Sequence, residues 1–375
     1  MKLAIPLTLF LMTLSPMTRA ASSTITTKPF GTTSAGEKVT QYTLRNDQGA
    51  SVSIINYGGI VTSLKVPDRK GKCDDIVLGF KTLAEYEKPG PYFGALIGRY
   101  GNRIANGEFT LDRKTYHLAR NNNGQALHGG LKGFEKVIWN ATPIETKQGP
   151  SLKLTYVSKD GEEGYPGKLS VTASYTLTNR NELKIVYRAK TDKATIVNLT
   201  HHSYFNLAGQ GSGDILNHLV TIHANKYTPV DKVLIPTGKL AAVKGTPFDF
   251  RKPTPIGARI NEVNEQLENG KGYDHNWIAD KLPGHLGMIA SVKEPNSGRV
   301  MEVISTEPGV QFYSGNFLDG TIIGKGNKVY GFRNGFCFEP QHFPDSPNHK
   351  NFPSTVLRPG ETYKNTIIYR FSIAK

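Results

Sequence analysis

The sequence predicts a mainly β fold, built as one large antiparallel β-sandwich with few short helices. Three observations favour this class. Gly, Tyr and Phe are frequent, at 39, 17 and 17 of 375 residues, whereas long helix-forming runs are few. Short segments of alternating apolar and polar residues recur from about residue 37 to residue 373, separated by turn residues. No linker, charge block or internal repeat divides residues 21–375, so we expect a single domain there.

The first 20 residues have the layout of a secretory signal peptide. Lys2 supplies a positive charge, residues 3–14 are mostly apolar, and the small residues Thr18 and Ala20 occupy positions −3 and −1 of the expected cleavage site. We therefore expect an exported protein, periplasmic or secreted, that is cleaved after Ala20. No later segment reaches about 18 apolar residues, so we expect no membrane anchor.

Alternating segments mark the strands of the sandwich. Residues 108–118 alternate around the polar turn Asp112-Arg113-Lys114, which predicts a β-hairpin. Further strands are predicted over residues 152–157, 169–177, 183–187 and 366–371. Helices are expected only over residues 83–88 and within residues 260–267.

Charge and cysteine content exclude some classes of protein. The formal net charge is +15, from 46 Lys and Arg against 31 Asp and Glu, but the basic residues are scattered along the chain. We therefore expect weak attraction to anionic surfaces and no nucleic-acid partner.

An oxidising compartment outside the cytoplasm would permit a disulfide between the two cysteines, Cys73 and Cys337. Cys337 lies in an apolar run that is typical of a buried free thiol, and the sequence leaves the pairing open.

Residues 198–206 form the most informative polar segment. In a strand, alternate residues share a face. One face would carry hydrogen-bonding side chains, namely those of Asn198, Thr200, His202, Tyr204 and Asn206. The other face, which includes His201, is mostly apolar. We therefore expect His202 to point to solvent or to a binding cleft and His201 to point to the core, and this pattern alone also permits an ordinary surface histidine at 202.

Glu339 stands in the apolar run Gly335-Phe-Cys-Phe-Glu-Pro-Gln-His-Phe-Pro344. Burying a carboxylate in such surroundings is costly unless it is paired or functional. Strand alternation places Glu339 on one face with Gln341, and the two flanking phenylalanines on the other. A glutamate on an edge strand beside Pro340 is the alternative interpretation.

Three Gly-flanked polar segments, residues 98–103, 127–130 and 272–277, could each be a plain turn. Gln311 lies in a strand-like run and could serve as another donor. The chain has no phosphate-binding loop, no dinucleotide-binding fingerprint and no spacing typical of metal ligands. We therefore expect chemistry that runs on side chains alone, without a metal or other cofactor.

Taken together and in order, these motifs resemble the aldose 1-epimerase (galactose mutarotase) family over roughly residues 28–373. The matching segments are residues 98–104, 127–130, 160–167, 198–207, 272–276, 308–313, 316–320 and 335–339. The resemblance implies the large β-sandwich of galactose mutarotases. It also implies an isomerase that interconverts the α and β anomers of free aldoses, such as glucose and galactose, by acid–base ring opening and reclosure.

The family's functional residues fall on matching positions of this chain. The resemblance places the general acid on His202 and the general base on Glu339. Sugar-binding roles fall on Asn102, Arg103, His128, Asp274 and Gln311. Glu339 would start ionised and His202 protonated, and a nearby carboxylate such as Asp274 would favour the charged histidine. The export signal departs from the many family members that look cytosolic, and it leaves the physiological pathway open.

Two other functions remain as alternatives. A glycoside hydrolase could use Asp274 and Glu339 as paired carboxylates, but it would leave His202 without a role. A non-catalytic sugar-binding module would need neither an acid nor a base. For the epimerase the expected partner is a small monosaccharide substrate, and the sequence leaves open both the preferred aldose and whether the chain is a monomer or a dimer.

Overall fold

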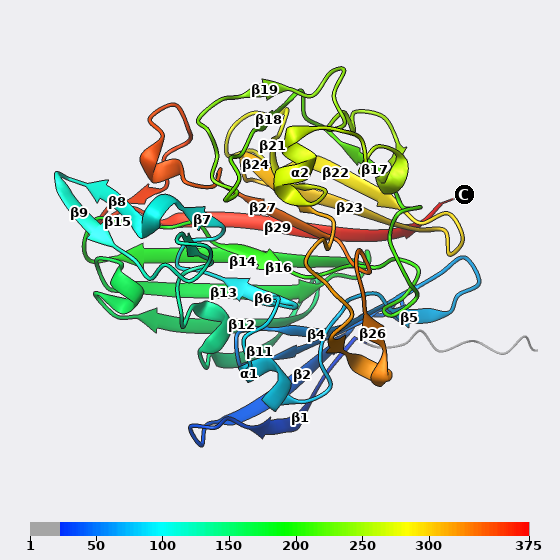
Figure 1. Cartoon of the computed structure of the whole chain (residues 1–375). Helices are drawn as coiled ribbons and strands as arrows, with labels where there is room; N and C mark the ends of the chain where they lie inside the picture. The colour runs from blue at the N-terminus through cyan, green and yellow to red at the C-terminus, as the bar shows by residue number, and fades with distance from the viewer. Residues whose placement is uncertain (1–22, 375) are drawn as a thin grey trace, which may run out of the picture.

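Antiparallel strands form most of the regular secondary structure in the computed structural model, which describes residues 23–374 (Figure 1). Two short α-helices accompany them, α1 (Leu83–Glu87) and α2 (Glu265–Gly270). This confirms the predicted mainly β class. The expected signal peptide, residues 1–20, lies outside the described residues. None of the helices among residues 23–374 is long and apolar enough to cross a membrane.

The largest sheet has nine antiparallel strands and runs across the middle of the molecule (Figure 1). In spatial order these are β11 (Asn140–Thr146), β12 (Gly149–Ser158), β13 (Leu169–Leu177), β14 (Glu182–Thr191), β29 (Tyr363–Ile373), β23 (Arg299–Ser305), β22 (Gly287–Lys293), β17 (Leu219–Ile222) and β20 (Thr254–Pro255). The four strands predicted over residues 152–371 all lie in this sheet and are confirmed. In β13 every second residue is buried, because one face of the strand packs on the core.

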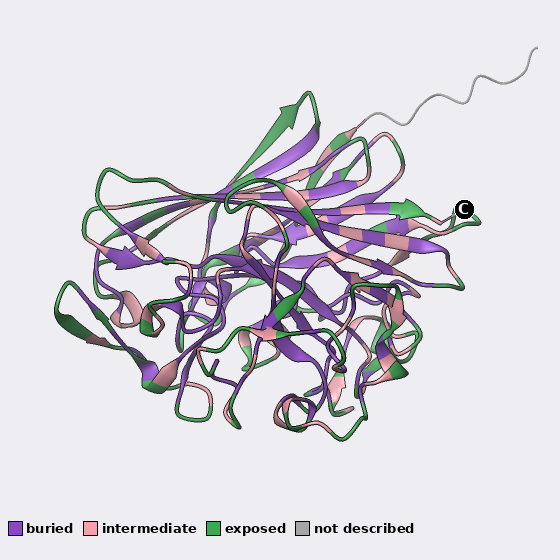
Figure 2. Cartoon of the chain, turned by 90° about the horizontal axis from the view of Figure 1, so that it is seen from above, coloured by how far each residue is buried: buried purple, intermediate pink, exposed green. Residues whose placement is uncertain are grey.

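Two five-stranded sheets pack against the nine-stranded one. The first comprises β1 (Thr24–Thr32), β2 (Lys38–Arg45), β3 (Ser51–Ile55), β4 (Val61–Pro67) and β5 (Cys73–Asp75). The second comprises β19 (Ala241–Ala242), β18 (Lys226–Thr228), β21 (Asp274–Ile278), β24 (Gly309–Tyr313) and β27 (Cys337–Gln341). One buried apolar cluster holds residues from all three sheets, for example Val52, Ile185 and Phe312. Figure 2 shows the buried segments in the middle of the molecule and exposed ones in the loops around it.

Short two-stranded pairs complete the fold. β6 (Ala95–Ile97) pairs with β16 (Thr200–His202), β7 (Arg103–Ile104) with β10 (Ala126–Leu127), β15 (Thr195–Ile196) with β28 (Val356–Leu357), and β25 (Ile322–Ile323) with β26 (Val329–Tyr330). The predicted hairpin is present as β8 (Glu108–Leu111) and β9 (Lys114–His117). Asp112 and Arg113 turn it with φ angles of 49° and 66°, as a tight two-residue hairpin turn requires.

Three local expectations need correction or completion. Residues 198–206 form only the three-residue strand β16, and their polar face is buried, with Asn198 and Thr200 inaccessible to solvent. The second helix starts later than predicted, because the Asn264 side chain accepts a hydrogen bond from the Gln266 N–H and caps the helix at that point. Cys73 is exposed and Cys337 is buried, and both are free thiols.

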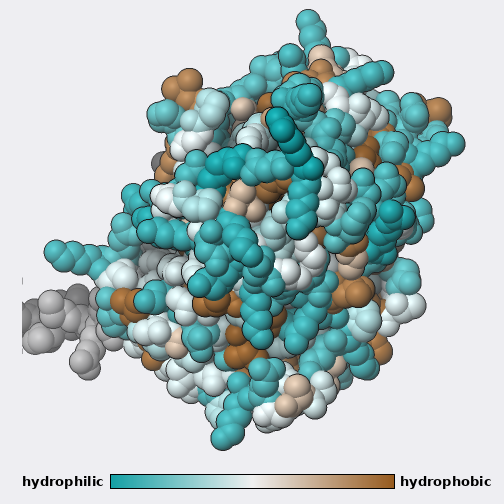
Figure 3. Space-filling model, turned by 90° about the vertical axis from the view of Figure 1, so that its left-hand side faces the viewer, coloured by the Kyte–Doolittle hydropathy of each residue, from teal (hydrophilic) through white to brown (hydrophobic). Residues whose placement is uncertain are grey.

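Hydrophilic side chains cover most of the face shown in Figure 3, with apolar side chains scattered among them. Such scattered apolar residues are normal for a folded protein and do not indicate a partner.

Candidate active site

A cavity of about 270 Å³ opens where β16, β21, β27 and the β7–β10 pair meet. Six of the predicted site residues line it: Asn102, Arg103, His128, His202, Asp274 and Glu339. Gln311 does not line the cavity itself, but it is hydrogen-bonded to Asp274, which does. Segments far apart in the sequence therefore place all seven predicted side chains in one region.

His202 and Glu339 face each other across the cavity. The His202 Nε2 lies 3.7 Å from the Glu339 Oε1, and the two residues are only 5% and 2% exposed. This burial excludes an ordinary surface histidine at position 202. His201 points to the opposite side of β16, where its ring nitrogens contact the Tyr175 hydroxyl at 3.3 Å and the Ser203 hydroxyl at 2.7 Å. Strand alternation therefore separates the two histidines as predicted.

Glu339 is held by the pairing of β27 with β24, which sets it opposite Gln311. On the other face of β27, Phe338 stacks on Phe312 with ring centroids 4.8 Å apart. β27 is an edge strand of its sheet, but its far side is covered by β16, where the Thr200 hydroxyl donates to the Pro340 carbonyl oxygen at 2.8 Å. The Glu339 Oε2 is buried without a hydrogen-bond partner among residues 23–374.

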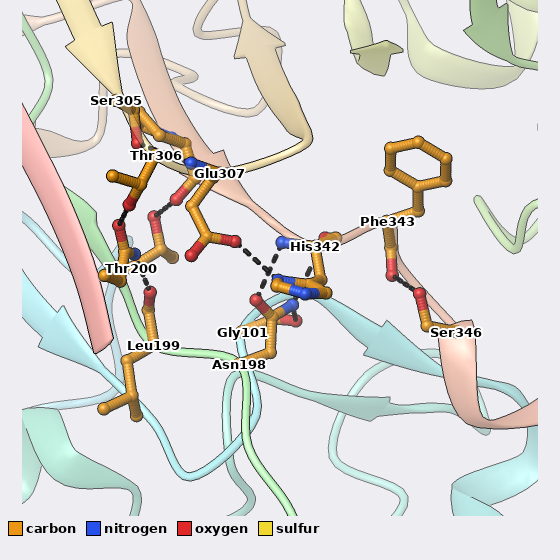
Figure 4. Close-up of polar contacts among 12 residues, drawn as sticks. Gly101, Asn198, Leu199, Thr200, Ser305, Thr306, Glu307, His342, Phe343 and Ser346 are labelled. Carbon is orange, nitrogen blue, oxygen red and sulfur yellow. Dashed lines mark hydrogen bonds and ion pairs between the residues drawn. The ribbon is translucent and has the colours of Figure 1, made fainter. Parts of the chain in front are cut away.

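A buried polar cluster fixes the end of β27 (Figure 4). The Asn198 Oδ1 accepts from the His342 N–H at 3.0 Å, and its Nδ2 donates to the carbonyl oxygens of His342 and Gly101 at 3.3 and 3.2 Å. The His342 Nδ1 lies 2.6 Å from the Glu307 carboxylate. The Asn198 side chain therefore ties the strand that carries Glu339 to the segment that carries Arg103.

Arg103 and Gln311 flank the carboxylate of Asp274. The Gln311 Nε2 donates to the Asp274 Oδ1 at 2.7 Å, and an Arg103 guanidinium nitrogen lies 4.0 Å from the Asp274 Oδ2. The Arg103 Nε also donates to the Asn122 Oδ1 at 3.3 Å. These contacts orient a cation and a carboxylate side by side, which suits binding of neighbouring hydroxyl groups.

His128 follows β10, whose Leu127 pairs with Arg103 of β7. Its Nδ1 accepts a hydrogen bond from the Asn102 N–H at 3.1 Å, so in the neutral ring the proton is on Nε2. The next residue must be glycine, because Gly129 has a φ of +97° and a Cβ there would lie 2.0 Å from the Gly98 carbonyl oxygen. His128 is thereby held as a donor, and Asn102 orients it.

Burial changes the protonation of the acid–base pair. It raises the pKa of Glu339 well above its usual value, with a further contribution from the charge of Asp274, whereas Arg103 acts in the opposite direction. Burial lowers the pKa of His202 to about 4. Desolvation disfavours both charged forms. Burial therefore disfavours the expected starting form with an ionised Glu339 and a protonated His202, and Asp274 acts on Glu339 rather than on His202.

The remaining ionisable groups are shifted by the same burial. Burial raises the pKa of Asp274, against the effect of Arg103 and Gln311. The pKa of His128 is lowered well below its usual value by burial and by the nearby His202 and Arg103. His128 is therefore neutral and keeps the Nε2 proton that its contact with Asn102 requires.

Among the described residues, three side chains that could act as metal ligands lie close together. Their spacing in the sequence did not indicate this. Donor atoms of His128, His202 and Glu339 lie within 4.8 Å of one another. A metal would need a free lone pair on the His128 Nε2, but that nitrogen carries the proton because Nδ1 accepts from the Asn102 N–H. The group therefore suits an oxygen that accepts a hydrogen bond better than it suits a cation.

Two features of the cavity were not found from the sequence. Aromatic side chains line it, namely Tyr92, Tyr313 and Phe317, beside Tyr204, which lies on the predicted face. The centroid of the Tyr92 ring lies 4.7 Å from that of His128 and 5.9 Å from that of His202. Tyr92 belongs to the run Pro91-Tyr-Phe-Gly94, whose aromatic residues between turn-forming residues could have indicated a binding loop. The Cys337 Sγ lies 3.6 Å from the His202 Nδ1. The alternation that places Glu339 on this face also places Cys337 there.

Comparisons with known proteins agree with the site. A model of the aldose 1-epimerase family matches residues 40–370. A galactose mutarotase from Rattus norvegicus is 50% identical over 341 residues, which cover 91% of this chain and 96% of that protein. An aldose 1-epimerase from Escherichia coli (strain K12) is 37% identical over 338 residues, which cover 90% of this chain and 96% of that protein.

A similar fold is found among solved structures. The crystal structure of a galactose 1-epimerase from Lactobacillus acidophilus superposes with a TM-score of 0.83 and 27% sequence identity. The match covers 94% of this chain and 100% of that one. The arrangement of sheets that forms the cavity is therefore shared with that protein.

Proposed function

Since the chain belongs to the aldose 1-epimerase family, we propose that its cavity opens and recloses the ring of a free aldose, such as galactose or glucose, with His202 and Glu339 as the acid–base pair. The chain is an isomerase that interconverts α and β anomers. The observation that carries the assignment of roles is the 3.7 Å approach of the two buried side chains in a cavity lined by further hydrogen-bonding groups.

Ring opening needs one base and one acid at the same time. The base removes the proton from the C1 hydroxyl, the C1–O5 bond breaks with its electron pair going to O5, and the acid donates a proton to O5. Rotation about C1–C2 then presents the other face of the aldehyde. On closure the O5 hydroxyl attacks C1, the former acid takes the proton back, and the former base returns its proton to the carbonyl oxygen. A positioned general acid and a positioned general base each accelerate the reaction by about 10²–10⁴-fold.

The pair carries one exchangeable proton in either of its two active forms. Glu339 ionised with His202 protonated, and Glu339 protonated with His202 neutral, differ only in the position of that proton. Burial favours the neutral form, and Arg103 favours the carboxylate. Because opening and closure exchange the roles of the two groups, the cycle uses both forms, with Glu339 as base and His202 as acid in the opening direction.

Neighbouring groups would hold the sugar in place for this proton transfer. The Nε2–H of His128 can donate to the ring oxygen or to a hydroxyl group beside it, and the Arg103–Asp274 pair can bind adjacent hydroxyls. Gln311 acts through Asp274, to which it is bonded. Orienting the substrate in this way is itself a large part of the rate enhancement.

The test is polarimetry of freshly dissolved α-D-galactose and α-D-glucose with the wild type and with Glu339→Gln. The wild type is expected to accelerate the approach to anomeric equilibrium, and the variant to lose about 10³-fold or more in kcat while remaining folded, because an amide cannot act as the base. Glu145→Gln, at an exposed position of β11, is the matched control and should retain full activity.

Two results would contradict the proposal. Near wild-type turnover by folded Glu339→Gln would refute its role. Release of nitrophenol from a nitrophenyl galactoside by the wild type, without acceleration of mutarotation, would favour a hydrolase that pairs Asp274 with Glu339.

We also propose that the protein is exported and acts on free sugars in the periplasm or outside the cell. The charged start, the apolar run and the small residues before Ala21 support this. Sequencing the N-terminus of protein recovered from the extracytoplasmic fraction tests it. A chain that begins at Ala21 is expected, and one that still begins at Met1 would refute cleavage.

A further inference from the structure

A second cavity of about 260 Å³ adjoins the candidate active site and shares Pro91 and Tyr92 with it as a common wall. The second cavity lies between the segment that includes α1 and the loop after it, and residues 130–136. None of the acid–base or sugar-binding groups described above is needed to form it. Its volume is nearly that of the active-site cavity, so it is large enough for a ligand of similar size.

Glu135 lines this cavity and has no role in the chemistry proposed above. It is only 6% exposed, and its Oε2 is buried without a hydrogen-bond partner among the described residues. The Oε2 itself is closed to solvent and lies near the backbone N–H groups of Gly133 and Glu135, so a ligand in the cavity can reach only the rest of the carboxyl group. Burial raises the pKa of Glu135 to about 7, so near neutral pH its carboxyl group can both donate and accept a hydrogen bond.

The other lining groups narrow the chemical class of the ligand. Lys88 and Lys136 lie at the cavity and disfavour an organic cation, and their ammonium groups can donate hydrogen bonds to hydroxyl oxygens. Phe80 and Tyr92 contribute aromatic surface, which packs well against the apolar face of a ring. A neutral ligand with hydroxyl groups around a compact ring satisfies all of these features.

We propose that this second cavity binds a pyranose unit, with a sugar hydroxyl paired to the Glu135 carboxyl group. The inference rests on the proposed function, because it takes the ligand to be a second sugar beside the reacting one. The pyranose can come from a second free monosaccharide molecule or from the non-reducing unit of a reducing disaccharide. The same cavity serves both, and the experiment separates them.

Two substitutions test the cavity without touching the catalytic residues. Gly90→Phe fills it from the loop, because a Cβ at Gly90 would meet nothing closer than 3.8 Å and its φ is not in the left-handed region. Glu135→Met removes the polar contact at similar length, and Glu135→Gln restores a hydrogen-bonding group. Ala84→Phe and Glu145→Met, both at exposed positions, are the matched controls.

The readouts are kcat/KM for galactose at low concentration, the shape of the galactose saturation curve, and KM for lactose. All variants are expected to keep kcat/KM for low galactose within about twofold of the wild type. If the second unit of a disaccharide binds in the cavity, KM for lactose rises at least fivefold in Gly90→Phe and Glu135→Met and recovers in Glu135→Gln. If a free monosaccharide binds there, lactose is unaffected, and a biphasic galactose curve in the wild type becomes hyperbolic in the same two variants.

The proposal is overturned if lactose KM and the galactose curve stay within twofold of wild type in both variants. It is also overturned if both variants lose activity equally toward galactose and lactose, because that indicates general damage. Failure of the wild type to accelerate mutarotation at all would instead refute the proposed function, so the two failures are distinguishable.

Discussion

At the scale of single residues, one position along a strand decides whether a histidine faces the cavity or the core. His201 and His202 are adjacent, yet the first contacts Tyr175 and Ser203 in the core, whereas the second faces Glu339. Both are buried, so exposure does not separate them. The two histidines differ instead in the face of β16 from which their side chains project.

His202→Ala is therefore expected to lose far more activity than His201→Ala. His201→Ala should mainly lower the free energy of unfolding, by about 1–3 kcal/mol, because it leaves a cavity in the core and removes the hydrogen-bond partner of the Ser203 hydroxyl. Polarimetric rates and urea denaturation of both variants provide the measurement. The assignment fails if His201→Ala is inactive while His202→Ala keeps its rate.

The pKa shifts of the pair set the pH dependence of the reaction. The active state holds one proton on the pair, so activity falls at low pH when a second proton binds and at high pH when the first is lost. With the pKa of His202 lowered to about 4 and that of Glu339 raised well above 4.5, the acidic limb reports protonation of His202 and the basic limb deprotonation of Glu339. Because the groups interact, the two apparent values belong to the pair.

We expect a broad plateau in kcat/KM between these limbs, and loss of the basic limb in the residual activity of Glu339→Gln. Measuring kcat/KM of both proteins from pH 3.5 to pH 10 tests this. An acidic limb near pH 6.5 that disappears in His202→Ala, with an unchanged basic limb in Glu339→Gln, would show that burial does not control the protonation of the pair.

At the scale of elements, the short strand β16 and the edge strand β27 work as a unit. Alternate side chains of the segment before and within β16 bind the backbone of β27 and of the residue after it. The Thr200 hydroxyl donates to the Pro340 carbonyl oxygen. The Asn198 amide oxygen accepts from the His342 N–H (Figure 4). The same segment carries His202. The distance between His202 and Glu339 therefore depends on hydrogen bonds from the side chains of one segment to the main chain of the other.

Thr200→Val, which keeps the shape and removes the hydroxyl, is expected to lower kcat several-fold with little change in KM. It should also destabilise the fold by about 1–3 kcal/mol, because the buried Pro340 carbonyl oxygen loses its donor. Thr200→Ser, which retains the hydroxyl, should recover most of kcat. If Thr200→Ser and Thr200→Val are equally impaired, packing of the methyl group is responsible rather than the hydrogen bond.

At the scale of the whole molecule, buried histidines and buried glutamates have opposite effects on how the free energy of unfolding changes with pH. Burial lowers the pKa values of His201 and His275 to about 3 and that of His218 to about 4, so below pH 6.5 the unfolded chain takes up protons that the folded chain does not. Burial raises the pKa values of Glu135 and Glu339, so there the folded chain binds protons first. Between about pH 4.5 and pH 6.5 the two groups partly offset each other.

Glu135→Gln isolates the contribution of one buried carboxyl group to the pH dependence of stability. The folded pKa of Glu135 is raised from 4.5 to about 7, so its stabilising contribution is complete below pH 4.5 and is lost as the pH rises through 7. Relative to the wild type, the variant should gain roughly 3 kcal/mol of unfolding free energy on going from pH 4.5 to pH 8. Urea denaturation of both proteins at the two pH values measures this, and a difference that does not change with pH would contradict it.

The sequence alone determined the features that depend on local patterns. Alternation located the long strands of the central sheet, and the Asp112-Arg113 turn located its hairpin. The order of the polar motifs indicated the family, and the same motifs hold the seven residues that lie together at the cavity. Alternation even separated His201 from His202, because the period of a strand is a local property.

Only the tertiary structure decided how these residues are charged, covered and joined. The polar face around Asn198 is buried because β27 packs over it, and that contact joins segments far apart in the chain. The His128 tautomer depends on the backbone of Asn102, and the cavity beside Glu135 depends on a loop that follows α1. Desolvation by distant segments raises the pKa of Glu339 and lowers that of His202, because a pKa responds to everything that displaces water from a group and not only to the residues beside it in the sequence.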